Sequence, residues 1–76
     1  MNIMIASNQL IQKVWKYINA LPKDPLDGTL DIAYEDHCKK LNISELDFSK
    51  ALDSLEHGGY IVKNGHWSGA IIQFKG

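Results

Sequence analysis

The sequence predicts a small α+β domain in which three helices are followed by a β-hairpin. Three observations indicate this class: apolar residues recur at helical spacing in three segments, capping or helix-breaking residues bound each segment, and the last third of the chain alternates apolar with polar residues. The chain has 76 residues, of which 45 % are hydrophobic and 22 % charged, and this suits one hydrophobic core. We expect a single domain over residues 1–76, with an N-terminal arm at 1–7, a loop at 22–29 and a wing-like hairpin at 60–74.

The first helix is expected to begin after Ser7 or Asn8, either of which can cap its first turn, and to end at about Leu21 before Pro22. Its core stripe consists of apolar residues at helical spacing: Leu10, Val14, Tyr17, Ile18 and Leu21.

A second apolar stripe on this helix predicts a homodimer. Ile11 and Trp15 lie one turn apart, and Ile3 and Ile5 stand close by in the arm MNIMIA. Because this is more apolar surface than one small core readily covers, we expect these four residues to form the dimer interface. In the alternative interpretation the arm folds back over Trp15 of its own chain, and the sequence does not decide between the two.

The middle of the chain predicts a short strand and two helices. LDI at 30–32 follows the turn-rich loop as a strand, and AYEDHCKKL at 33–41 has helical spacing. Asn42 tolerates the left-handed conformation that ends a helix, and Ser44 can cap a third helix over residues 45–57, which two glycines end. The third helix has this buried stripe: Phe48, Ala51, Leu52 and Leu55.

The last segment predicts the β-hairpin. The pair Asn64-Gly65 is the strongest two-residue turn signal, although a looser loop over residues 64–69 gives the same alternation. In both cases four apolar residues should face the core: Ile61, Ala70, Ile72 and Phe74.

The motifs HCKKLNIS and ALDSLEHGGYIV, together with the order of the elements, resemble the winged helix-turn-helix superfamily of bacterial and phage regulators. The resemblance covers about Asn8 to Phe74. It places Cys38 at the small-residue position where the second and third helices approach closely, and Asn42 where a glycine commonly occupies the turn. It implies a winged helix-turn-helix fold of three helices with a small antiparallel sheet and wing, in a bacterial, phage or prophage protein.

In this superfamily the third helix lies in the major groove of DNA and presents its early solvent-facing residues to the bases. The resemblance therefore implies a transcriptional regulator that binds double-stranded DNA, and this is our leading expectation. The residues expected to bind are Glu45, Leu46, Ser49, Lys50 and Asp53 of the third helix and Lys63, Asn64, His66 and Trp67 of the wing.

The charges of these residues keep a second interpretation open, in which the winged helix binds a protein as an antirepressor-like or replication-associated adaptor. The net charge is −1 and every basic residue is a lysine, so the arginine that commonly reads guanine is missing. Glu45 and Asp53 would repel the phosphates that supply most of the binding free energy. A continuous lysine face beside the third helix would favour DNA, whereas acids and an exposed Trp67 on one face would favour a protein. Trp67 has a third interpretation, packing across the hairpin on Val62.

Other classes of function have little support. His37, Cys38, His57 and His66 have no zinc-site spacing, and no glycine-rich loop precedes a helix. We therefore expect no enzyme, no cofactor and no metal, and Cys38 should be a packing residue. A single cysteine suits a reducing compartment, and the arm has the features of neither a signal peptide nor a membrane span, so we expect a cytoplasmic protein.

Overall fold

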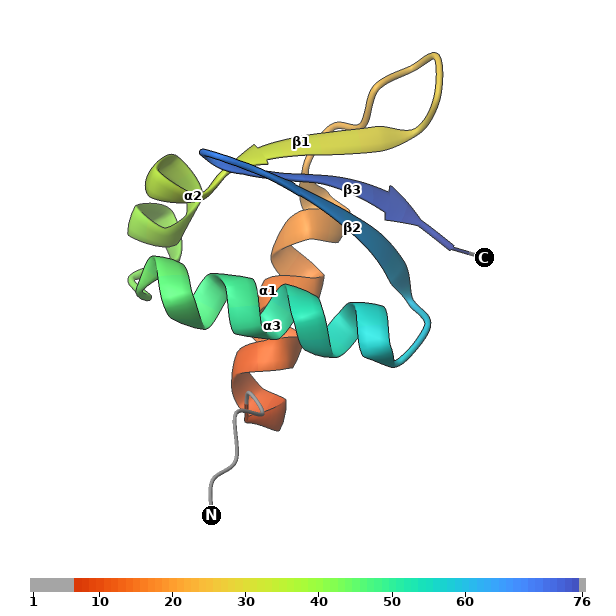
Figure 1. Cartoon of the computed structure of the whole chain (residues 1–76). Helices are drawn as coiled ribbons and strands as arrows, with labels where there is room; N and C mark the ends of the chain where they lie inside the picture. The colour runs from red at the N-terminus through yellow and green to blue at the C-terminus, as the bar shows by residue number, and fades with distance from the viewer. Residues whose placement is uncertain (1–6, 76) are drawn as a thin grey trace.

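The computed structural model of the chain describes residues 7–75, which form three helices and a three-stranded antiparallel sheet. Figure 1 shows the sheet on one side of the domain and α1 and α3 crossing each other on the other side. The arrangement is α+β with the topology of a winged helix, as predicted. In chain order the elements are α1 (Asn8–Ala20), β1 (Thr29–Ala33), α2 (Tyr34–Leu41), α3 (Glu45–His57), β2 (Ile61–His66) and β3 (Gly69–Phe74).

Helices α1 and α3 begin where the sequence places their capping residues. The Ser7 side chain accepts a hydrogen bond from the backbone N–H of Leu10 at 3.2 Å, and the Ser44 side chain accepts one from that of Asp47 at 3.0 Å. Asn42 has φ 58° and ψ 46° and so makes the left-handed turn between α2 and α3. The predicted bounds of α3 are confirmed.

The sheet has the strand order β1-β3-β2, so the last strand lies in the centre. One face of the sheet is buried against the helices and the other is open to solvent, where Asp31, Ile71 and Gln73 are exposed. The predicted inward positions of the hairpin are confirmed, with Phe74 half-buried. The buried face consists of Leu30, Ile32, Ile61, Ala70 and Ile72.

The hairpin turns at Trp67 and Ser68, so the predicted turn at Asn64-Gly65 is wrong. The pair lies within β2, where Asn64 is opposite Ile71 and Gly65 opposite Ala70. A turn at Asn64-Gly65 would leave most of β3 without a partner on this side, whereas the longer hairpin pairs Ile61 with Phe74. Cross-strand burial therefore outweighs the local turn preference.

Gly69 is the residue that lets β1 and β3 approach. A Cβ atom built on Gly69 would collide with the carbonyl oxygen of Ile32, so this position admits only glycine without a backbone shift. The neighbouring turn is tied to the helices, because the N–H of Tyr34 donates to the carbonyl oxygen of Ser68 at 3.2 Å.

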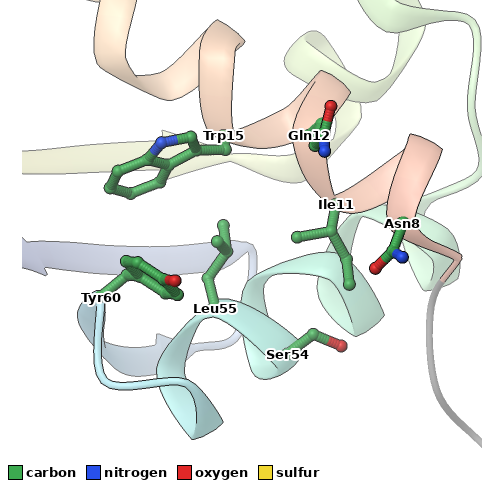
Figure 2. Close-up of a pocket in the computed structure, with 7 residues that line it drawn as sticks. All are labelled: Asn8, Ile11, Gln12, Trp15, Ser54, Leu55 and Tyr60. Carbon is green, nitrogen blue, oxygen red and sulfur yellow. The ribbon is translucent and has the colours of Figure 1, made fainter.

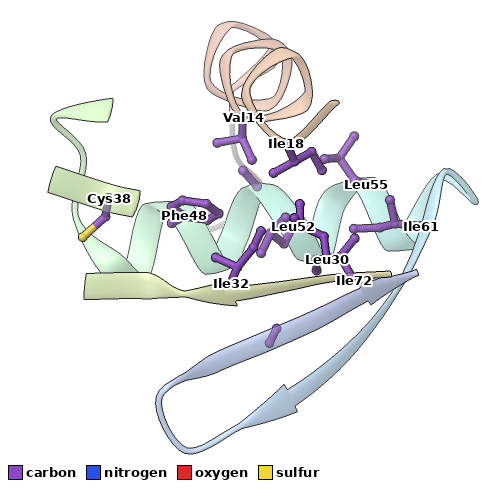
Figure 3. Packing of buried hydrophobic residues seen from close by; sticks show 12 residues of the cluster. Val14, Ile18, Leu30, Ile32, Cys38, Phe48, Leu52, Leu55, Ile61 and Ile72 are labelled. Atoms are coloured by element: carbon purple, nitrogen blue, oxygen red, sulfur yellow. The ribbon is translucent and has the colours of Figure 1, made fainter. Parts of the chain in front are cut away.

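The core lies where α3 packs between α1 and the sheet, as Figure 3 shows. Phe48 and Leu52 of α3 are fully buried there, between the α1 residues Val14 and Ile18 and the inner face of the sheet. Cys38 is 6 % exposed and is a packing residue, as predicted, with its Sγ 3.5 Å from the carbonyl oxygen of Glu35.

Candidate functional site

The solvent-facing side of α3 carries five of the predicted binding residues. Glu45, Leu46 and Asp53 are exposed, and Leu46 keeps 62 % of its surface in contact with solvent. Ser49 and Lys50 are half-buried. Since Phe48 and Leu52 fix the opposite side of the helix in the core, this side is available to a partner.

Lys63 of the wing is held against α3. Its Nζ lies 2.5 Å from the Asp53 carboxylate and 3.2 Å from the Ser49 hydroxyl, and its backbone N–H donates to the Glu56 carboxylate at 2.9 Å. Only 14 % of the Lys63 side chain is exposed, compared with 61 % of the Asp53 side chain. We call these four residues the lysine clamp: Ser49, Asp53, Glu56 and Lys63.

The electrostatics of the lysine clamp keep Lys63 charged. Burial lowers the pKa of Lys63, but the hydrogen bond to Asp53, the Tyr34 phenol and the Asp53 charge raise it by more, so the pKa ends above its usual value. The ammonium group is therefore protonated at neutral pH, and the Asp53 carboxylate beside it neutralises its charge. The sequence alone indicates no structural role for Asp53, and the lysine clamp supplies one.

The remaining charge on α3 is negative. The helix contains four acids and one lysine, and the lysine clamp neutralises only Asp53. The charges that remain on α3 are therefore three negative ones, on Glu45, Asp47 and Glu56, and one positive one, on Lys50. The first two lie in the first turn of α3, where the helix dipole favours acids.

Four of the other lysines do not extend a positive face beside α3, whereas Lys40 is exposed on α2. Lys39 pairs with Glu35 on α2 at 3.6 Å. Lys23 lies 4.5 Å from the ring centroid of Phe74. Lys13 and Lys16 are exposed on α1, but helical spacing places them on the opposite side of that helix from its buried face. The continuous lysine face that would favour DNA is not formed by these residues.

The wing tip presents Trp67. This side chain is 98 % exposed, so it does not pack on Val62. His66 is instead held to the sheet, with its Nε2 at 3.1 Å from the Asp31 carboxylate and its Nδ1 at 3.4 Å from the backbone N–H of Ser68. Since Nδ1 accepts from Ser68, Nε2 carries the proton that is donated to Asp31.

The predicted binding residues thus do not form one cluster. Ser49, Asp53 and Lys63 meet in the lysine clamp on the side of α3 that faces β2. Asn64 is exposed further along β2, and Trp67 stands at the turn. The structure joins the helix to the wing through contacts within the chain, which we did not predict from the sequence.

A groove of about 330 Å³ lies on the other side of α3, between it and α1 (Figure 2). The predicted dimer residues Ile11 and Trp15 are half-buried in it, whereas Ile3 and Ile5 lie outside the described residues. The Trp15 ring packs within the chain, with its centroid 5.5 Å from that of Tyr60 and 6.1 Å from that of Phe74. The groove is lined by Asn8, Ile11, Gln12, Trp15, Ser54, Leu55 and Tyr60.

Tyr17 and His37 form a polar contact between α1 and α2 that the sequence did not reveal. The Tyr17 hydroxyl lies 2.6 Å from His37 Nδ1, and the rings meet edge to face. Burial lowers the pKa of His37, Lys40 lowers it further, and Asp36 opposes both. Burial also raises the pKa of Tyr17. Both residues stand at apolar-stripe positions and have polar tips, which is the signal that could have predicted the pair.

Comparison of the chain with family models, curated proteins and solved structures gives no match. The described helices are all too short or too polar to cross a membrane. The function must therefore be argued from the arrangement of α3, the wing and the groove.

Proposed function

We propose that this protein is a winged-helix interaction module that binds a basic protein surface through α3 and the wing. The observation that carries the proposal is the lysine clamp. Because the Asp53 carboxylate neutralises the Lys63 ammonium group, Lys63 does not offset the other acids of α3. The solvent-facing side of the helix therefore keeps a net negative charge.

The same charge disfavours DNA. Proteins gain most of their affinity for DNA by neutralising phosphates, and those with strong affinity make about six to ten such contacts. On α3 only Lys50 is placed to contact a phosphate. The three acids that the lysine clamp does not neutralise would repel the phosphate backbone of DNA. A basic protein surface would instead gain from this charge pattern, which speeds association and sets orientation.

Exposed apolar side chains on α3 and at the wing tip support a protein partner. Leu46 is 62 % exposed at the start of α3 and Trp67 is 98 % exposed at the wing tip. Aromatic residues are enriched in protein interfaces and often contribute most of the binding energy. We expect the partner to offer apolar contacts for these two residues and lysine or arginine for the acids of α3.

A regulator that binds DNA is the second candidate, and two observations favour it. The winged-helix topology leaves α3 exposed, and Lys50 and Trp67 both face solvent at least in part. Such binding would be weak and would depend steeply on salt, because few cations contribute.

The test is a pair of fluorescence-polarisation titrations, one against mixed-sequence duplex DNA and one against a lysine-rich peptide that contains leucine. We expect negligible DNA affinity at about 50 mM salt, where nonspecific binders hold DNA appreciably. We expect the wild-type protein to bind the peptide. The double variant Glu45→Gln and Trp67→Ala should no longer bind it.

Matched variants separate the candidates. Lys50→Gln removes the free cation of α3, and Lys13→Gln is the control on the far side of α1. If duplex DNA binds with a dissociation constant of about 10⁻⁴ to 10⁻⁶ M, and Lys50→Gln alone lowers the salt slope, DNA binding replaces the proposal. Absence of peptide binding together with absence of DNA binding would also contradict it.

A further inference from the structure

The groove between α1 and α3 is an apolar surface that the described residues leave open. Figure 2 shows that it runs from Asn8 and Ser54 at one end to Trp15 and Tyr60 at the other. Leu55 forms part of its floor and is itself 3 % exposed, so the groove continues the hydrophobic core outward. Apolar surface of this kind is stabilised when another apolar segment covers it.

We propose that residues 1–6 of the same chain occupy this groove, with Ile3 and Ile5 directed into it. This inference concerns a different side of α3 from the lysine clamp and does not depend on the proposed function. Its starting point is the position of Ser7, which caps α1 and delivers the preceding residues directly to Asn8 at one end of the groove.

The reach and the pattern of the segment fit the groove. Asn8 and Trp15 are separated by seven residues of α1, or about 10 Å along the helix axis. Six residues of extended chain span up to about 20 Å, so the segment can turn back and run past Trp15. In an extended chain Ile3 and Ile5 point to one side and Met4 to the other, so the two isoleucines can enter the groove together.

The size of the groove favours this occupant over a second copy of the chain. Seven residues line the groove, whereas a stable interface between two proteins takes about 20 to 30 residues on each side. A tethered segment also has a local concentration of about millimolar or more, which a second molecule lacks. The size of the groove and the tether thus favour the fold-back alternative over the expected dimer through Ile3, Ile5, Ile11 and Trp15.

The experiment uses Trp15 as the reporter. The sequence has two tryptophans, so Trp67→Phe leaves Trp15 as the single source of indole fluorescence. In this background the double substitution Ile3→Ser and Ile5→Ser should shift the Trp15 emission to longer wavelength, increase its quenching by acrylamide and lower the urea midpoint. Met4→Ser is the matched control and should leave all three unchanged. Far-UV circular dichroism shows whether the variants keep the fold.

Two measurements on the unmodified chain complete the test. Nuclear Overhauser contacts between the methyl groups of Ile3 or Ile5 and the Trp15 indole should be present in a protein that sediments as a monomer. Unchanged Trp15 emission in the double variant, with no such contacts, would overturn the proposal. A dimer that dissociates when Ile3 and Ile5 are replaced would also overturn it and assign the segment to a second copy.

Discussion

The two sides of α3 differ in polarity and in how far their groups are paired or covered by the rest of the chain. Towards β2 the helix is polar, and Ser49, Asp53 and Glu56 are all bonded to Lys63. Towards α1 the helix is apolar, and Leu55 borders an open groove. One helix therefore has a side whose polar groups find partners within the described chain and a side that still has apolar surface to cover.

The difference shows where each kind of partner should bind. On the β2 side, a ligand that needs Lys63 must break the lysine clamp, so this side favours a partner that accepts its negative charge. On the α1 side, any apolar segment of suitable length gains by binding, and residues 1–6 precede the helix that borders the groove. Under the two proposals, the polar side determines which partner binds, and the apolar side contributes to the stability of the fold.

The largest effect is expected for Leu55→Ala, which removes a side chain shared by the core and the groove. Leu55 is 3 % exposed, so its truncation should cost about 2–5 kcal/mol of the free energy of unfolding, measured by urea denaturation. Leu46→Ala is the control, because Leu46 is 62 % exposed and its loss should stay within about 0.5 kcal/mol. Similar losses for the two variants would contradict the division between the buried and exposed sides of α3.

The contact of α3 with α2 should rank next. Cys38→Leu adds volume where Cys38 is buried, so we expect it to cost about 1–3 kcal/mol in the same measurement. Cys38→Ser should cost less, because its hydroxyl can donate to the Glu35 carbonyl oxygen that Sγ now approaches. Ligand binding by the serine variant should be unchanged. Full stability of the leucine variant would show that α2 and α3 are not closely packed there.

The lysine clamp should contribute less, since Asp53 is largely exposed. A double-mutant cycle of Lys63→Met and Asp53→Asn should give a coupling free energy below about 1 kcal/mol that shrinks as salt is added. The pKa of Lys63 is raised in the folded state, so its contribution is present below the unfolded value of about 10.4 and is lost as pH rises through the folded value. Wild type should therefore lose more stability than Lys63→Met in alkali. Equal losses would show that the ion pair does not form.

The smallest effect is expected at His37. Burial lowers its pKa in the folded state, so below about pH 6.5 the unfolded chain takes up the proton first. Stability should fall as the pH drops through 6.5 towards the folded pKa, and this fall should be smaller in His37→Gln. Proton NMR can follow the residue directly. A pKa of His37 above 6.5 in the folded protein would contradict its burial beside Tyr17.

Local signals predicted the helices, because their ends depend on neighbouring residues. Ser44 caps α3 and Asn42 makes the left-handed turn before it, and both act within three or four residues along the chain. The turn of the hairpin could not be predicted in this way. It depends on which residues of β2 and β3 bury each other, and Asn64-Gly65 lies within a strand despite its strong turn preference.

The lysine clamp was missed for a related reason, although a signal was present. Lys63 follows Ile61 by two residues, so strand alternation places both on the inner face of the sheet. A lysine on an inner face needs an acid, and Asp53 lies ten residues earlier on α3. This alternation distinguishes Lys63 from a free cation of the wing. The groove could be predicted only in part, because Ile11 and Trp15 stood out but their partners Leu55 and Tyr60 come from a distant part of the chain.

The absence of a side chain at Gly69 limits which insertions and deletions the hairpin can accept during evolution. Gly69 is paired with Ala33 on one side and His66 on the other, and any Cβ at this point collides with Ile32. Moving β3 by a single residue would bring Ser68 or Ala70 to that point, so neighbouring alignments of the strands are blocked. An insertion or deletion of one residue in the hairpin is therefore expected to be tolerated only on the turn side of this pairing.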